Sequence, residues 1–341
     1  MLHGGDLGWA MEAYGGQKED WLDLSTGINR RSYPFSIDRA LSDIRELPST
    51  TDLKTCLEAA RLAYQCPKDL TIVAGPGTQI LINSIPHILK PGRCHIAEPT
   101  YSEHRGAMEL AGVPCSGFTA IDDLLAQNID QRSCVIVVNP NNPDGHTLSS
   151  PELLEFSVHL QKSNSTLIID EAFGDIDPTQ SIIPHLSSRS NIVVFRSFGK
   201  FFGLAGIRLG FVIGSEEITN KITSFHGPWT ASSVALKVGS QALSDLEWHK
   251  KERELLTHWS ERLQSCLARH GLSVVGGTGL YLLIESEYAR RLHMHLAKHH
   301  IWSRIFTYQD RWLRLGIPMQ DAELKRFVSA LDCFVVEAAN D

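Results

Sequence analysis

Six short apolar runs between residues 70 and 214 constrain the fold of this 341-residue chain more than any other feature. Each run is rich in Val and Ile and almost continuously hydrophobic, which is typical of strands buried on both faces of a parallel sheet. Helix candidates separate the runs, including residues 78–89 and 150–162, where SSPELLEF has the form of a capped helix start. The runs occupy residues 70–75, 93–98, 133–140, 165–173, 191–198 and 208–214. This alternation predicts an α/β fold with a mostly parallel sheet covered by helices.

The character of the chain changes after Gly227 and Pro228. A long charged helical stretch at about 231–270 precedes a strand candidate in GGTGLYLLIE, another helix, two more strand candidates and a last helix near 321–337. A chain of this length exceeds the usual size of one core. We therefore predict an N-terminal arm over residues 1–35, a large domain over 36–230, and a smaller α+β domain over 231–341 that the N-terminal segment completes.

Composition argues against several kinds of partner. The net charge is −7 and no block of Lys and Arg would follow a phosphate backbone, so nucleic acid is not an expected ligand. We find neither a basic N-terminal head with an apolar run nor a stretch of about 18 apolar residues, so no membrane segment is expected. The seven cysteines form no CxxC pair. We expect buried thiols, a cytoplasmic location and no metal site.

Ligands of open parallel sheets bind outside the carboxyl ends of the strands, so the residues after each run are the candidates for a site. Gly75 to Gln79 form a glycine turn that opens a helix, an arrangement that suits an anion. Tyr101 could stack on an aromatic ligand, and an amide of NPNNPDG (139–145) could hold a phenolate oxygen. Taken singly, each feature is more common as plain turn or packing structure.

Two later runs end in charged groups. Asp170 of DEAF could hold a protonated pyridine nitrogen, which makes the ring an electron sink; otherwise it is a helix cap or a surface ion pair. In SFGKFFGLAGIRLGF, Ser197 and Arg208 suit a phosphate, and Lys200 is a candidate for a Schiff base with a carbonyl cofactor. The alternative is a lysine that extends its charge to the surface. Together, and in this order, these groups form the set that pyridoxal phosphate needs.

The motifs resemble those of the fold-type I pyridoxal-phosphate enzymes, in the histidinol-phosphate aminotransferase branch of the aspartate aminotransferase superfamily, over nearly the whole chain. The resemblance implies catalytic roles for Lys200 and Asp170, with Arg314 of WLRLGI holding the substrate carboxylate. It also implies a homodimer with active sites at the subunit interface. The cofactor-binding residues that it implies are Gly77, Thr78, Gln79, Tyr101, Asn142, Asp170, Ser197, Lys200 and Arg208.

Narrower features, including HGGD (3–6), STGIN (25–29) and PTYSEH (99–104), are similar to the threonine-phosphate decarboxylases of cobalamin biosynthesis. The implied reaction converts L-threonine O-3-phosphate to (R)-1-aminopropan-2-yl phosphate and CO2. The alternatives are a histidinol-phosphate-type aminotransferase and a non-catalytic sensor of a phosphorylated metabolite. The substrate-binding residues implied are His3, Gly27, Asn142, Arg304 and Arg314.

Three positions depart from the pattern of these families. Phe173 replaces a tyrosine, Leu47 and Pro48 occupy the place of a tyrosine-proline pair, and Asp144 stands where threonine is usual. The first removes a hydrogen bond to the phenolic oxygen of the cofactor. The second leaves the cross-subunit contact to the cofactor phosphate open.

Overall fold

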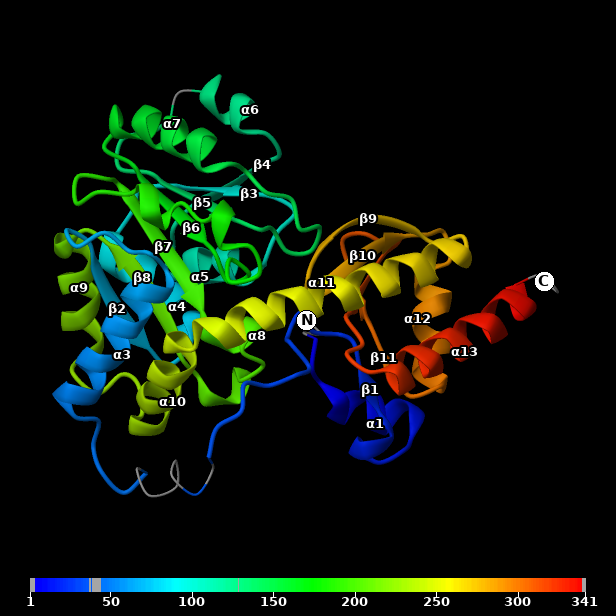
Figure 1. Ribbon diagram of the computed structural model, residues 1–341. Coiled ribbons are helices and arrows are strands. Elements are labelled where there is room, and N and C mark those ends of the chain that lie inside the picture. Colours follow the sequence, from blue (N-terminus) through cyan, green and yellow to red (C-terminus); the bar gives the residue numbers. More distant parts are fainter. Residues whose placement is uncertain (1–3, 37, 39–43, 128, 339–341) are drawn as a thin grey trace. The chain divides into compact units, whose positions relative to one another are not determined.

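The computed structural model describes residues 4–36, 38, 44–127 and 129–338. It divides into two compact units: residues 32–248 form the large unit, and residues 1–31 with 249–341 form the small unit. His3, a predicted substrate residue, lies outside the described residues. Each unit has its own sheet and its own helices (Figure 1).

A seven-stranded sheet forms the centre of the large unit, in the order β2-β8-β7-β6-β5-β3-β4. Strand β8 is antiparallel to both of its neighbours, and the other adjacent pairs are parallel. Each predicted apolar run contains one strand, but β4 was not predicted because its sequence, CSGF, is short and only partly buried. The strands are β2 (Thr71–Gly75), β3 (Cys94–Ala97), β4 (Cys115–Phe118), β5 (Cys134–Val138), β6 (Thr166–Asp170), β7 (Ile192–Ser197) and β8 (Gly210–Gly214).

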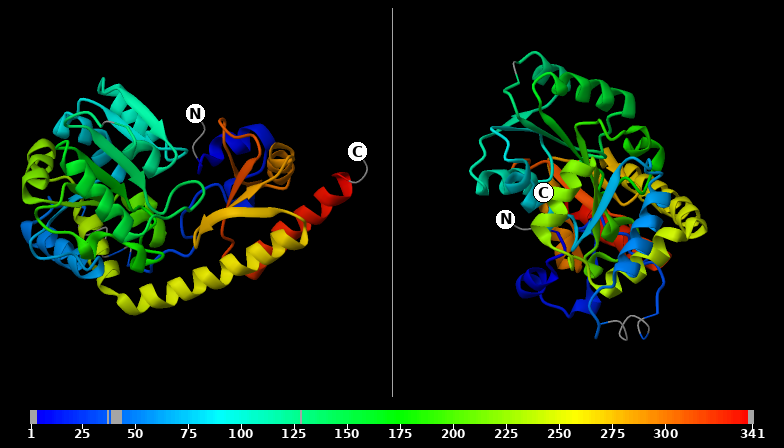
Figure 2. Two further views of the ribbon diagram at one scale, coloured as in Figure 1. Left: turned by 90° about the horizontal axis from the view of Figure 1, so that it is seen from above. Right: turned by 90° about the vertical axis from the view of Figure 1, so that its left-hand side faces the viewer.

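Helices cover both faces of this sheet, as the two views of Figure 2 show. On one face α4 (Thr78–Leu89), α5 (Glu103–Leu110) and α9 (Glu216–His226) bury apolar side chains against alternate residues of the central strands. Toward the other face lie α3 (Thr50–Ala63), α7 (Ser150–Gln161) and α10 (Ser233–Ser244). Shorter elements complete the unit: α6 (Ile121–Leu125), α8 (Phe198–Phe201), η2 (Pro178–Gln180), η3 (Ile183–His185) and η4 (Ala205–Ile207).

The predicted capped start of α7 is confirmed. The Ser149 side chain accepts from the backbone N–H of Glu152, and the Glu152 carboxylate accepts from the backbone N–H of Ser149 at 2.8 Å. This reciprocal pair satisfies two N–H groups that the first turn of a helix leaves without an internal partner.

The small unit contains two sheets. Strand β1 (Leu22–Asp23) pairs in parallel with β11 (Ile301–Trp302), so the N-terminal segment does join the C-terminal part of the chain. A four-stranded antiparallel sheet has the order β12-β13-β10-β9. Its strands are β9 (Ser273–Thr278), β10 (Tyr281–Glu285), β12 (Arg304–Ile305) and β13 (Trp312–Gly316), and the accompanying elements are α1 (Leu7–Tyr14), η1 (Lys18–Asp20), most of α11 (Leu246–Arg269), α12 (Ala289–Lys298) and α13 (Asp321–Ala338).

The helical stretch predicted at 231–270 is two helices. Asp245 lies between α10 and α11, and its carboxylate accepts from the backbone N–H of Trp248 at 3.0 Å. Helix α10 packs in the large unit: a Cβ on Gly239 would lie 2.4 Å from Leu209 Cδ2 and 3.4 Å from Cys56 Sγ. Residues 231–248 therefore belong to the large unit, whereas we expected the boundary at residue 230.

Two further expectations concern single groups. Five of the seven cysteines are buried, but Cys115 is partly exposed and Cys333 is exposed, so the prediction of burial was wrong for these two. Among the described residues, no helix combines the length and the apolar character needed to cross a bilayer.

Candidate active site

A cavity of about 130 Å³ opens at the sheet edge where β2, β5, β6 and β7 have their carboxyl ends and where β8 begins. All nine residues predicted to bind the cofactor line it, although they come from loops far apart in the sequence. They meet because parallel strands deliver their carboxyl ends to one edge of a sheet. Its lining residues are Gly77, Thr78, Gln79, Tyr101, Val138, Asn142, Asp170, Ala172, Phe173, Ser197, Gly199, Lys200, Ala205, Arg208 and Leu209.

Asp170 ends β6 and is 2% exposed. Its Oδ1 accepts from the backbone N–H of Ala172 at 2.9 Å, and its Oδ2 lies 2.8 Å from His104 Nε2. These two contacts fix the carboxylate plane without using a cation from the surface. Asp170 is therefore neither a surface ion pair nor a helix cap, and the alternatives considered for it do not apply.

His104 is a residue that the sequence reasoning missed. It lies on α5, is 2% exposed and contacts Asp170 from the helical layer. His104 is the last residue of the PTYSEH motif, but the pairing of a histidine with a carboxylate 66 residues away has no local signature.

Lys200 lies on α8, the short helix that follows β7 directly. Its ammonium is 5.8 Å from the centroid of the Phe173 ring, which is buried at 4% exposure. The phenylalanine that replaces the family's tyrosine therefore presents a ring face to the lysine, an arrangement that attracts a cation. Lys200 is only partly exposed and lines the cavity, so it does not extend its charge away from the site.

An anion cradle forms one end of the cavity. Gly77 precedes α4 with φ +81°, and a Cβ added to it would lie 2.5 Å from Arg208 Nη2. A Cβ on Gly210 would lie 2.7 Å from the backbone nitrogen of Thr78. Only glycine allows these approaches. The first turn of α4, the Arg208 guanidinium and the Ser197 hydroxyl thus line one cavity, a set that fits a phosphate group.

Tyr101 and Gln79 form a further part of the wall. The Tyr101 hydroxyl donates to Gln79 Oε1 at 2.9 Å. Burial, followed by the nearby carboxylates of Glu103 and Asp170, raises the pKa of Tyr101 to about 12. The hydroxyl therefore keeps its proton at neutral pH and remains the donor of this bond.

The other predicted substrate residues lie in the small unit. Arg304 and Arg314 face each other directly across β12 and β13. Arg314 is 7% exposed, its Nη2 donates to the carbonyl of Ser25 at 3.0 Å, and it lies 4.9 Å from the Tyr281 ring centroid. Burial lowers the pKa of both arginines. Two like charges at directly opposed positions of a sheet repel each other, so an anion bound between them would relieve an unfavourable contact.

The Ser25 turn joins three of the motifs noted in the sequence. Ser25 is fully buried, and its Oγ accepts from the backbone N–H of Gly5 at 2.7 Å. A Cβ on Gly4 would lie 2.3 Å from the Ser25 carbonyl oxygen, the same oxygen that receives Arg314. The structure therefore brings together Gly4 and Gly5 of HGGD, the STGIN turn that contains Gly27, and Arg314. The sequence alone could not show this.

A buried charge cluster lies on the opposite face of the sheet from His104. Arg196, one residue before Ser197, donates to Glu171 Oε2 at 2.9 Å and to Asp175 Oδ1 at 2.5 Å, and its guanidinium lies 4.3 Å from the Tyr64 ring centroid. Because successive strand residues point to opposite faces, Asp170 faces the helix that carries His104 while Glu171 faces Arg196. We name Arg196, Glu171, Asp175 and Tyr64 the Arg196 cluster.

Comparison with known proteins agrees with the fold. The family model "Aminotransferase class I and II" matches residues 37–331, so the chain belongs to this family. The histidinol-phosphate aminotransferase from Sinorhizobium meliloti, solved in complex with pyridoxal-5'-phosphate, has a similar fold, with a TM-score of 0.84 at 19% identity over 97% of this chain and 94% of that one. The predicted fold class is confirmed.

Two relatives within this family are more similar to the chain in sequence. A threonine-phosphate decarboxylase from Sinorhizobium sp is 38% identical over 335 residues, 97% of each chain. Another from Pseudomonas aeruginosa is 37% identical over 334 residues, again 97% of each chain. The resemblance to these decarboxylases, inferred from the motifs, is confirmed.

Proposed function

We propose that this protein is a pyridoxal-phosphate-dependent enzyme that decarboxylates L-threonine O-3-phosphate to (R)-1-aminopropan-2-yl phosphate and CO2, a step of cobalamin biosynthesis. The observation that carries the choice of reaction is the identity of 37–38% to threonine-phosphate decarboxylases over 97% of the chain. A histidinol-phosphate aminotransferase, the alternative, is only 27% identical over 77% of the chain.

The residues of the cavity fit pyridoxal phosphate. Ser197, Arg208 and the first turn of α4 would hold its phosphate, the Tyr101 ring would lie on its ring, and Asn142 would donate to its phenolic oxygen. Asp170 would pair with the ring nitrogen, and Lys200 would take the carbonyl carbon. When bound, the cofactor supplies a protonated ring that accepts the electron pair released at the substrate Cα.

The contribution of the protein is to choose which bond at Cα breaks. The substrate carries two anionic groups, a carboxylate and a phosphate, and the opposed guanidiniums of Arg314 and Arg304 suit them. In the proposed role, Arg314 holds the carboxylate, while Arg304, with His3, holds the phosphate and Gly27 lies beside the substrate. If these contacts orient the substrate so that the bond between Cα and the carboxylate is the one aligned with the electron-accepting ring, CO2 leaves and a proton takes its place at Cα. If the C–H bond is directed there instead, Lys200 removes that proton and transamination follows.

We also propose a cytoplasmic homodimer, with neither nucleic acid nor membrane as a partner, as the resemblance implies. Large apolar side chains of the large unit support an interface: Leu47, Phe225 and Trp229 are 68%, 55% and 61% exposed. Leu47 is the residue that stands at the place of the family's tyrosine. At this position we expect Leu47 to make an apolar contact with the partner subunit, where the family's tyrosine would use its hydroxyl. Sedimentation that reports a monomer at micromolar concentration would contradict this part of the proposal.

The test of the reaction is to mix cofactor-loaded protein with L-threonine phosphate and no keto acid, and to record CO2 and the absorbance of the cofactor. Stoichiometric CO2 that disappears in Lys200→Ala supports the decarboxylase. The matched control is Lys221→Ala, an exposed lysine of the same unit that is paired with Glu217, which should keep full activity. Turnover only after 2-oxoglutarate is added would make the protein an aminotransferase, and no spectral change at all would contradict a role for Lys200.

A further inference from the structure

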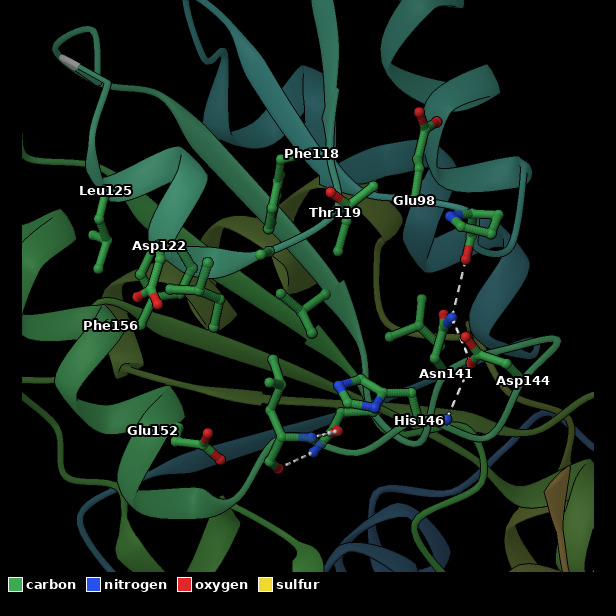
Figure 3. Close-up of a pocket in the computed structure, with 18 of the residues that line it drawn as sticks. Glu98, Phe118, Thr119, Asp122, Leu125, Asn141, Asp144, His146, Glu152 and Phe156 are labelled. Carbon is green, nitrogen blue, oxygen red and sulfur yellow. Dashed lines mark hydrogen bonds between the residues drawn. The ribbon is translucent and has the colours of Figure 1, made fainter. Parts of the chain in front are cut away.

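The loop between β5 and α7 separates two cavities. Its residue Asn142 lines the cofactor cavity, while Asn141, Asp144 and His146 line a second cavity of about 400 Å³ (Figure 3). Val138, the last residue of β5, lines both cavities. The contacts of the side chains that face the second cavity therefore help to determine the position of this loop relative to the cofactor cavity.

Asn141 connects this loop to the loop after β3. Its Nδ2 donates to the carbonyl of Pro99 at 3.0 Å, and its Oδ1 accepts from the Thr100 hydroxyl at 2.6 Å. The residue after Thr100 is Tyr101, and the residue after Asn141 is Asn142, both of which line the cofactor cavity. One amide thus fixes the distance between the two backbones that carry these residues.

Asp144 fixes the orientation of that amide. Its Oδ1 accepts from Asn141 Nδ2 at 2.9 Å and from the backbone N–H of His146 at 3.0 Å (Figure 3). An ionised carboxylate only accepts hydrogen bonds, so the NH2 group of Asn141 must face it. The Oδ1 of Asn141 is then turned toward Thr100. The threonine that is usual at position 144 carries a hydroxyl, which both donates and accepts and would not impose this orientation.

The backbone supports the same geometry. The N–H of Asn141 donates to the carbonyl of His146, and the N–H of Gly145 donates to the carbonyl of Asn141, both at 2.8 Å. Further along, Asn139 and Leu148 exchange two hydrogen bonds, from Nδ2 to the Leu148 carbonyl at 3.0 Å and from the Leu148 N–H to Oδ1 at 2.8 Å. The loop is thus closed on itself, and Asn141 is its side-chain link to the neighbouring loop.

We propose that Asp144 and Asn141 are positioning residues: the Asp144 carboxylate orients the Asn141 amide, and this amide sets the separation of Tyr101 and Asn142 across the cofactor cavity. The inference rests on the proposed function, since it takes Tyr101 and Asn142 as contacts of pyridoxal phosphate. Neither positioning residue lines the cofactor cavity, so their effect reaches the cofactor through the two residues that do.

The experiment compares cofactor binding in Asp144→Ala, Asp144→Asn and Asn141→Asp. The first removes the acceptor, the second keeps an acceptor oxygen without the charge, and the third removes the NH2 donor while keeping the shape. The control is Asp122→Ala, an exposed carboxylate on the wall of the second cavity outside this loop. Circular dichroism of the cofactor-free proteins shows first that each variant is folded.

The readouts are the dissociation constant of pyridoxal phosphate and the pH at which the absorption band of the bound cofactor changes. The band reports on the phenolic oxygen, where Asn142 would donate, and a loss of general stability does not move it. A hydrogen bond to a charged group changes an equilibrium constant by a factor of about ten or more. We therefore expect Asp144→Ala and Asn141→Asp to raise the dissociation constant of the cofactor about tenfold and to shift the pH at which the band changes. The Asp144→Asn amide can donate as well as accept and so does not impose the orientation, and this variant should fall between Asp144→Ala and wild type. The control should stay within about twofold of wild type.

A double variant tests the order of action. If Asp144 acts through Asn141, then Asp144→Ala should have no further effect on binding or on the band in an Asn141→Ala background. Additive effects would overturn the inference, and so would an Asp144→Ala protein that binds the cofactor as wild type does with an unmoved band. A wild-type protein that binds no pyridoxal phosphate would instead contradict the proposed function itself, so the two failures are distinguishable.

Discussion

Replacing Arg196 tests whether the buried Arg196 cluster stabilises the large unit. Arg196 is 2% exposed and donates to two carboxylates, so Arg196→Met would leave Glu171 and Asp175 buried without their cation. Burial by itself lowers the pKa of Arg196, but Asp175 and Glu171 together raise it above its usual range. Removing one partner of a buried ion pair costs about 3–5 kcal/mol, and we expect a loss of that size in the free energy of unfolding.

Arg105 offers a matched control. It also contacts two carboxylates, Glu98 at 2.7 Å and Glu109 at 3.2 Å, but its side chain is 29% exposed. Solvent screens these pairs, so Arg105→Met should cost less than about 1 kcal/mol. The same number of ionic contacts is thus compared at two levels of burial.

The assay is urea unfolding of the cofactor-free proteins, followed by both circular dichroism and tryptophan fluorescence because a chain of two units need not unfold in one step. A variant in which Glu171→Gln and Asp175→Asn accompany Arg196→Met should recover part of the loss, since no uncompensated charge remains. An Arg196→Met protein as stable as Arg105→Met would refute the reasoning.

Three other substitutions test separate parts of the structure. Burial and two nearby arginines lower the pKa of His293 to about 4. The folded state therefore loses up to about 3 kcal/mol of unfolding free energy as the pH falls from about 6.5 toward 4. Urea unfolding measured at several pH values should show a smaller loss for His293→Gln. Burial raises the pKa of Glu252, so its ionisation opposes folding. Glu252→Gln should therefore gain unfolding free energy relative to wild type as the pH rises above the ordinary glutamate pKa of about 4.3, and a difference that does not change with pH would contradict this. Gly77→Ala places a Cβ 2.5 Å from Arg208 Nη2 and should weaken cofactor binding at least about tenfold in a fluorescence titration, whereas Gly112→Ala, also at positive φ but with no atom within 4 Å of its Cβ, should leave binding unchanged.

Much of the large unit could be predicted from local patterns. Strands buried on both faces must be apolar at nearly every position, so the runs that contain β2, β3, β5, β6, β7 and β8 were visible. Strand β4, at the edge, needs no such run and was missed. The break at Asp245 was missed because no Gly or Pro lies at the junction of the two helices, and only the packing of α10 on α3 assigns the first part to the large unit.

The candidate site divides in the same way. Nine of the residues that line the cofactor cavity were predicted, because most of them lie at or just after the end of an apolar run and parallel strands bring such residues to one edge. Their supports were not: the contact of His104 with Asp170 and that of Arg196 with Glu171 join residues 66 and 25 positions apart. Asp144 appeared in the sequence only as a departure from a family pattern, and the structure adds its bonds to Asn141 and to the His146 N–H, on which the proposed positioning role rests.

By itself the sequence determined most of the order of strands and helices in the large unit, the class of fold and the cofactor, and it supplied the candidate residues for the cofactor site, because these depend on hydrophobic periodicity and on motifs of a few neighbouring residues. Only the tertiary structure decided which side chains orient those residues and where the two units divide. A hydrogen bond between distant segments depends on which faces the folded elements turn to one another, and that is a property of packing rather than of local sequence.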